Sequence, residues 1–212
     1  MSLKSKLRTL LKIDPRIMRK LRKVVAPFRR IGLKKQFTIF SDNCWGGRLY
    51  DKFALQYLSP TIGLAIEESD YIKFLLNLDY YISLTPKPII NNQKKVNDEW
   101  GYYDCLLGDI KIQFRHYRDV NDAINKWERR KHRIFKDNII VKMSYYDNQP
   151  DVLNAFISLP YKKILFTSDE KLVKNNNDLL KIIYIPKESI DAEFITSDSK
   201  LKLKDIKSLI NL

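Results

Sequence analysis

Short apolar segments alternate along most of this chain with segments whose apolar residues repeat every three or four positions. The short segments are typical of buried strands, and they fall at residues 37–40, 62–66, 80–84, 110–114, 139–143, 164–166 and 182–185. Helical spacing occurs at residues 51–58, 69–78, 120–134, 152–159 and 205–212, and Asp119 is placed to cap the third of these. Strands alternating with helices predict an α/β fold, with a mostly parallel sheet and helices on both faces.

The first 35 residues differ in character from the rest. Apolar residues at helical spacing occur on both sides of Pro15: Leu3, Leu7, Leu10 and Leu11 before it, and Ile17, Leu21, Val24 and Phe28 after it. Two short amphipathic helices are expected, and Pro27 is expected to end the second within a residue or two. The chain is therefore divided into a basic amphipathic helical arm, residues 1–35, and a single α/β domain, residues 36–212.

Most of the net charge of +14 belongs to the arm, which holds thirteen Lys and Arg residues against one acid, Asp14. Two interpretations stay open. The arm lies on an anionic membrane surface through its basic and apolar sides, or it packs its apolar side on the domain and leaves the basic side in solvent. Nucleic acid is disfavoured as a partner, because Phe28 is the arm's one aromatic residue and offers no stacking platform.

Several classes of protein are excluded by motifs that the chain lacks. Its two cysteines, Cys44 and Cys105, form no CxxC or Cys/His cluster, which argues against a disulfide framework and a zinc site. The six glycines form neither GxGxxG nor a P-loop, and HExxH, GxSxG and Asp-x-Asp are missing. We therefore expect no cofactor and no metal. Without a signal peptide or a long apolar run, a cytoplasmic location is expected, peripheral at the inner face of the membrane if the arm binds there.

Ligands of parallel α/β sheets bind beyond the carboxyl ends of the strands, so the residues after each predicted strand are the site candidates. These are segments 41–47 (SDNCWGG), Glu67-Glu68, His116-Tyr117, 144–147 (SYYD) and 167–169 (TSD). In the first segment, Cys44 precedes a predicted helix whose amide groups would stabilise a thiolate, and His116 is placed to act as its base. The alternatives are a partly buried Cys44 acting as a small hydrophobe, and a structural His116 that continues the alternation from Ile110 to Phe114.

Arginines gather on the helix predicted at 120–134. Arg129, Arg130 and Arg133 are suited to phosphate or carboxylate groups, such as those of a sugar nucleotide. A solvated face with arginines paired to Glu128 would give the same pattern.

Three segments carry a resemblance to a known family: FTIFSDNCWGGRLYDKFALQYLSPTIGL from residue 37, DYIKFLLNLDYYI from residue 70 and FRHYRDVNDAINKWERRKHRI from residue 114. Together they resemble an uncharacterised bacterial family whose members are often labelled exopolysaccharide or capsular polysaccharide biosynthesis proteins. The resemblance implies a role in making or decorating surface polysaccharide, with a glycan or activated sugar as substrate. With the strand-end rule, it gives Cys44 and His116 as the catalytic pair and a substrate-binding set of Ser41, Asn43, Gly46, Gly47, Thr61, Tyr117, Arg129 and Arg130.

Three functions follow as hypotheses. The first is a glycan-modifying transferase, with acyl transfer through Cys44, His116 as base and the amides near Gly46 and Gly47 as an oxyanion site. The second is a glycosyl- or phospho-transferase-like enzyme that uses the arginine cluster. The third is a non-catalytic assembly factor held at the membrane by the arm. Whether the chain is an enzyme is left open by the sequence.

Overall fold

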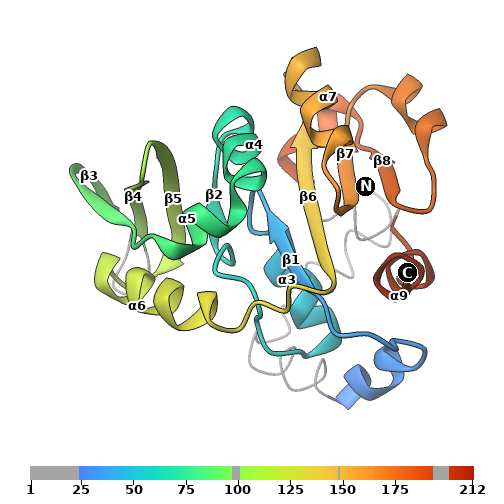
Figure 1. Cartoon of the computed structure of the whole chain (residues 1–212), viewed down its shortest axis with the longest axis horizontal. Coiled ribbons are helices and arrows are strands. Elements are labelled where there is room, and N and C mark those ends of the chain that lie inside the picture. Colours follow the sequence, from blue (N-terminus) through green and yellow to red (C-terminus); the bar gives the residue numbers. More distant parts are fainter. Residues whose placement is uncertain (1–23, 97–100, 148, 193–200) are drawn as a thin grey trace, which may run out of the picture.

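The computed structural model describes residues 24–96, 101–147, 149–192 and 201–212, and within them the strands form two four-stranded sheets (Figure 1). Sheet A is parallel, in the order β1 (Thr38–Ser41), β6 (Ile139–Tyr145), β7 (Lys162–Thr167) and β8 (Leu180–Tyr184). Sheet B is antiparallel, in the order β2 (Leu64–Ala65), β5 (Ile110–Tyr117), β4 (Gly101–Leu107) and β3 (Lys87–Lys95). Sheet B lies in the long connection between β1 and β6.

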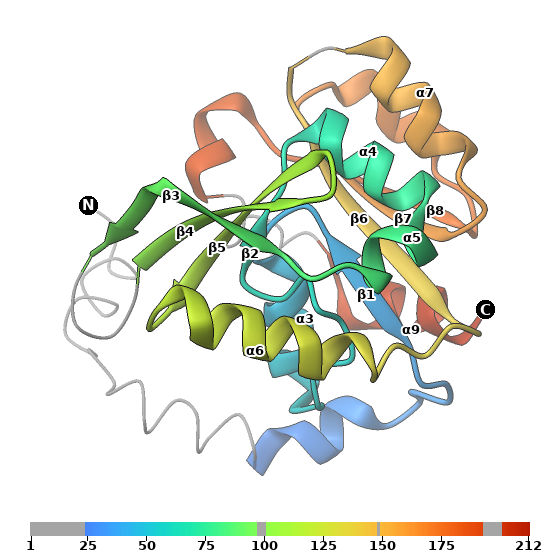
Figure 2. The same cartoon turned by 60° about the vertical axis from the view of Figure 1, so that its left-hand side comes forward.

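Helices cover both faces of sheet A. The described helical elements are α3 (Trp45–Phe53), α4 (Glu68–Leu76), α5 (Leu78–Ser83), α6 (Val120–Lys131), α7 (Pro150–Ser158), α9 (Leu203–Asn211), and the 3-10 helices η1 (Glu170–Asn175) and η2 (Lys187–Ala192). Side chains alternate along the strands, so Ile39 and Phe166 pack with α3 and α9, whereas Phe40 and Val141 join the core shared with α4, α7 and sheet B. Figure 2 shows α6 running beside sheet B.

The predicted α/β class, with a mostly parallel sheet and helices on both faces, is confirmed. Asp119 caps α6 as predicted, since its carboxylate accepts a hydrogen bond from the amide of Asp122 at 2.7 Å. The strand predicted at 80–84 is wrong, because residues 80–83 belong to α5, whose buried residues Leu78 and Tyr81 are three positions apart. Strands β3 and β4 were not predicted, because their polar residues obscure the alternation of apolar and polar positions that is typical of a strand.

The bounds predicted for the helix at 51–58 are wrong, because α3 begins six residues earlier, at Trp45, and ends five residues earlier, at Phe53. Gly46 and Gly47 lie inside this helix rather than in a turn. A Cβ atom on Gly46 would lie 3.2 Å from Ser41 Cβ, and one on Gly47 would lie 3.0 Å from Ile62 Cγ2. The two glycines therefore let α3 approach β1 and the segment before β2 closely.

The described end of the arm is a helical segment, residues 24–30. It continues three residues past Pro27, to Arg30, and the chain turns at Gly32, whose φ of +80° suits glycine. The helix therefore ends one residue beyond the residue or two expected after Pro27. Residues 1–23, with the first predicted helix and the start of the second, lie outside the described residues. No helix in the described part of the chain is long and apolar enough to cross a membrane.

Candidate functional site

A polar cleft of about 430 Å³ opens at the carboxyl ends of β1 and β6. Asp42 and Asn43, which follow β1, and Ser144 of β6 line it. The connection from β2 to α4 adds segment 65–69, sheet B adds Arg115, and the chain after β6 adds Tyr146, Asp147 and Gln149. The cleft therefore lies where both sheets meet, at the edge of a parallel sheet where ligands are expected.

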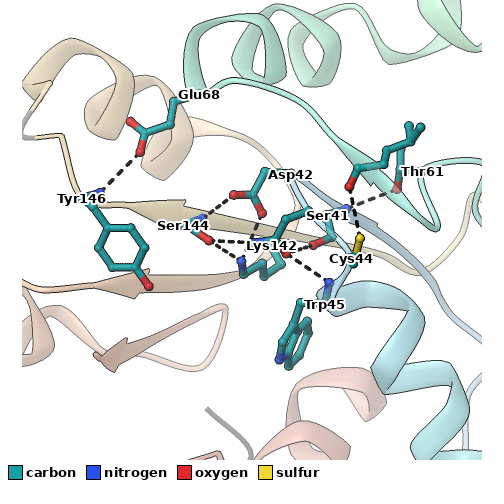
Figure 3. Close-up of polar contacts among 11 residues, drawn as sticks. Ser41, Asp42, Cys44, Trp45, Thr61, Glu68, Lys142, Ser144 and Tyr146 are labelled. Carbon is teal, nitrogen blue, oxygen red and sulfur yellow. Dashed lines mark hydrogen bonds and ion pairs between the residues drawn. The ribbon is translucent and has the colours of Figure 1, made fainter. Parts of the chain in front are cut away.

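A buried ion pair anchors the cleft (Figure 3). Lys142 of β6 is fully buried, and its Nζ lies 3.1 Å from Oδ1 of Asp42. The other carboxylate oxygen of Asp42 accepts the backbone amide of Ser144 at 2.8 Å, and Lys142 Nζ also donates to Ser144 Oγ. The Phe166 ring centroid lies 4.5 Å from the ammonium nitrogen. This network fixes β1 against β6 at the point where both strands reach the cleft.

Asn43 joins the network to the start of α3. Its Nδ2 donates to Ser144 Oγ at 3.1 Å, while its Oδ1 accepts the amide of Trp45 at 3.1 Å and the hydroxyl of Ser41 at 3.3 Å. The amide of Ser41 in turn donates to Thr61 Oγ1 at 3.3 Å. Of the predicted substrate-binding residues, Asn43 lines the cleft, whereas Ser41 and Thr61 are buried and support it from behind.

Glu68 is the titratable group of the cleft that stands out. Partial burial raises its pKa to about 7; the nearby charges of Asp147 and Asp42 act in the same direction, and a hydrogen bond from the Tyr146 amide opposes them. Its Oε1 accepts that amide at 3.4 Å, while Oε2 is buried and has no hydrogen-bond partner among the described residues. A carboxyl group in this state can both take up and release a proton near neutral pH.

Cys44 lies at the N-cap of α3, half-buried, with Sγ 3.8 Å from the carbonyl oxygen of Leu64. Burial raises its pKa above the ordinary value and Asp42 adds to this, although the cations of Arg115 and Lys142 pull in the opposite direction. The thiol is therefore mostly protonated at neutral pH.

His116 does not continue the alternation of β5. Its φ is +65°, and the pairing of β4 with β5 shifts between Gly101 and Tyr102, so His116 occupies a β-bulge. Its side chain is exposed, and partial burial together with the charge of Arg115 lowers its pKa. The prediction that His116 extends the buried face of the strand is wrong. It is the bulge that brings Tyr117 to the buried side, where its ring packs against Phe114.

Tyr117 and Arg130 form a structural contact behind the cleft. Arg130 is buried, and its Nη1 donates to Tyr117 Oη at 2.8 Å and to the carbonyl oxygen of Ile62 at 3.1 Å. Tyr117 donates to the same carbonyl. The structure separates Arg130 from Arg129, whose side chain is exposed on α6, and neither lines the cleft.

Reasoning from strand ends selected Glu68, Ser144, Tyr146 and Asp147 as candidates, yet assigned roles to none of them. Lys142 and Arg115 were missed altogether. A lysine within an otherwise apolar strand was the available signal for Lys142, because such a charge needs a buried partner. No group of three His, Cys, Asp or Glu side chains suited to a metal occurs within the described ranges.

The fold and the cleft define a mixed α/β protein with a polar site where a parallel and an antiparallel sheet meet. The chain belongs to the DUF1919 family, described as a domain of unknown function, whose model matches residues 16–205. An uncharacterised protein of Haemophilus influenzae is 29% identical over 132 residues, which span 61% of this chain and 61% of that protein. The resemblance to an uncharacterised family is thereby confirmed, and the polysaccharide role stays a prediction.

Proposed function

We propose that this protein is a transferase that modifies a glycan in surface polysaccharide biosynthesis, with its active site in the cleft around Glu68. The observation that carries the proposal is a carboxyl group with a pKa of about 7 and an unpartnered oxygen, in a polar cleft at the carboxyl edge of a parallel sheet. The glycan substrate rests on the resemblance carried by residues 37–134.

In the proposed reaction, the Glu68 carboxylate accepts the proton of an acceptor hydroxyl as its oxygen bonds to the transferred group. The bond from that group to the donor breaks, and its electron pair leaves with the donor fragment. Arg115 is the cation of the cleft wall that would neutralise charge on the donor, since a guanidinium pairs well with phosphate or carboxylate. Asn43 and Ser144 would orient the acceptor, because the ion pair behind them holds both in place.

The alternative route within this class is acyl transfer through a Cys44 thioester, with His116 as base. The raised pKa of Cys44 argues against it, because the thiolate is the nucleophile. A diphosphate site on Arg129, Arg130 and Arg133 is also disfavoured, because Arg130 is engaged by Tyr117 and Ile62 in the interior. The proposed place of action is the cytoplasmic face of the membrane, since residues 1–35 carry a net charge of +12.

The test is complementation of a strain that lacks the gene, with surface polysaccharide measured by composition and mass. Wild-type protein and a control variant, Glu170→Gln on the exposed side of η1, should restore the polysaccharide, whereas Glu68→Gln should not. Folding of each variant is checked by circular dichroism. Restoration by folded Glu68→Gln would exclude Glu68 as the base, and failure of Cys44→Ala alone would favour the thioester route.

Restoration by every folded variant, including the double variant Cys44→Ala/His116→Ala, would point to a non-catalytic assembly role. A deletion strain with an unchanged polysaccharide, grown where that polysaccharide is made, would contradict the pathway assignment.

A further inference from the structure

The helical segment 24–30 has two opposite sides of different character. Ala26 is 1% exposed, and Arg30 donates through Nε to the carbonyl oxygen of Phe53 at 2.7 Å; this side faces the end of α3. Val24, Phe28 and Ile31 lie four and three positions apart, on the opposite side, and are 67%, 72% and 70% exposed. The segment therefore sits on the body through one side and presents an apolar ridge, Val24, Phe28 and Ile31, to the outside.

The orientation of this ridge is fixed by several contacts. Arg29 Nη1 donates to the carbonyl oxygen of Lys52 at 3.3 Å, and Lys207 Nζ of α9 donates to the carbonyl oxygen of Ile31 at 2.6 Å. Beyond the turn, the amide of Lys34 donates to Asn211 Oδ1 at 2.8 Å. In both views the blue helical segment lies at the lower edge of the molecule (Figures 1 and 2). Because the ridge is already held in place, its binding to a flat surface would cost little conformational entropy.

Positive charge lies at the Ile31 end of the ridge. The ammonium group of Lys207 lies beside the carbonyl of Ile31, and Lys34 and Lys35, three and four positions further along the chain, are exposed. Residues 1–35 contain thirteen basic residues and one acid. An apolar ridge beside lysines, in a strongly basic arm, matches the interface of an anionic bilayer, where apolar side chains enter the acyl boundary and the cations meet the headgroups.

We propose that Val24, Phe28 and Ile31 form a membrane-docking surface, and that its partner is a bilayer containing anionic phospholipid. The described end of the arm would thus combine the two arrangements that the sequence left open: one side packs on the body, and the other meets the membrane. Docking is independent of the cleft chemistry, because the surface shares no residue with the cleft.

The experiment is co-sedimentation of the full chain with phosphatidylcholine vesicles, with and without phosphatidylglycerol. The variant Val24→Ser/Phe28→Ser/Ile31→Ser keeps every charge of the protein. It should bind the anionic vesicles at least about tenfold more weakly than wild type, because three apolar side chains no longer enter the bilayer. The matched control is Leu76→Ser/Tyr80→Ser/Ile90→Ser, at positions 59%, 55% and 86% exposed, and it should bind as wild type.

Raising the salt concentration should weaken wild-type binding, and vesicles of phosphatidylcholine alone should bind least. Equal binding by the ridge variant and wild type would overturn the proposal, as would wild-type protein that sediments with neither kind of vesicle. Equal binding to both kinds of vesicle would overturn the part of the proposal that names anionic phospholipid as the partner. Glu68→Gln should bind vesicles as wild type, so failure of docking and failure of the proposed transferase are separate outcomes.

Discussion

At the scale of single residues, Glu68 links stability to pH. Its pKa is about 7 in the folded protein against an ordinary value of 4.5. Between these values the folded state binds more protons than the unfolded state, so the stability from protonated Glu68 is lost as pH rises through the window. Above neutral pH, the ionised Glu68 therefore lowers the stability of the folded state. Such a loss of stability is typical of groups whose pKa is shifted for catalysis.

The substitution Glu68→Gln should raise the melting temperature at pH 8 and leave it nearly unchanged below pH 4, where both states are protonated. After discounting for partial exposure, the gain is about 1 kcal/mol, or roughly 2–4 °C for a chain of this size. Differential scanning calorimetry across the pH range measures it. An equal gain at both ends of the range would contradict the assigned pKa of Glu68.

The backbone conformation at the His116 bulge predicts that glycine is more stable at this position than alanine. At a φ of +65°, a side chain costs about 1 kcal/mol that glycine avoids, so His116→Gly should be more stable than His116→Ala by this amount. Because both variants lack the imidazole, the difference between their stabilities reports the backbone strain alone. Chemical denaturation measures the difference, and an Ala variant as stable as the Gly variant would be inconsistent with the bulge.

Burial also predicts how the two thiols react. Cys105 is fully buried with a pKa of about 12, whereas Cys44 is half-buried with a smaller rise, so iodoacetamide should modify Cys44 faster than Cys105 and slower than a free thiol. Arg115 lowers the pKa of Cys44, so Arg115→Gln should slow its labelling, while His116→Ala should leave the rate unchanged. Mass spectrometry of time points measures the rates. A marked slowing by His116→Ala would restore the Cys44/His116 pairing.

At the scale of elements, the Asp42–Lys142 ion pair joins β1 to β6. Asp42→Asn leaves a fully buried ammonium without its anion and should cost about 3–5 kcal/mol. The double variant Asp42→Asn/Lys142→Met should lose less than the sum of the single changes, because it removes the stranded charge. Urea denaturation of all four proteins tests this. Strict additivity would show that the pair contributes no coupling.

Helices and strands with a clear apolar pattern were predictable from the sequence. Elements whose place depends on contacts with other elements were not. The strands of sheet A carry long apolar runs, and α6 has its cap and inner stripe. In contrast, β3 gains its place by pairing with β4, and α3 includes glycines that only close packing on β1 explains. The cleft was predictable as a set of strand ends. The pKa of Glu68 was not, because it depends on burial and on Asp42 and Asp147, distant in the sequence.

At the scale of the whole molecule, the residues that line the cleft also connect the two sheets. The carbonyl oxygen of Asp42 accepts the amide of Ile66 at 2.8 Å, which ties β1 to the chain after β2. Phe40 and Val141 of sheet A share one core cluster with Leu64 and Phe114 of sheet B. A second cluster, which includes Trp45, lies on the other face of sheet A, and Trp127 belongs to the shared cluster.

We therefore expect the two sheets to unfold together in one cooperative transition, because separating them would expose the shared cluster. Two variants, each with a single tryptophan, test this. Trp100→Phe/Trp45→Phe keeps Trp127, which reports on the shared cluster. Trp100→Phe/Trp127→Phe keeps Trp45, which reports on the α3 and α9 face. After correction for the stability lost in each variant, fluorescence and far-UV circular dichroism should give coincident urea transitions for both proteins. A lower midpoint for Trp127 fluorescence than for circular dichroism in the same protein would show that sheet B and α6 open first. The cleft would then be lost before sheet A unfolds, since Arg115 and the β2–α4 connection form two of its walls.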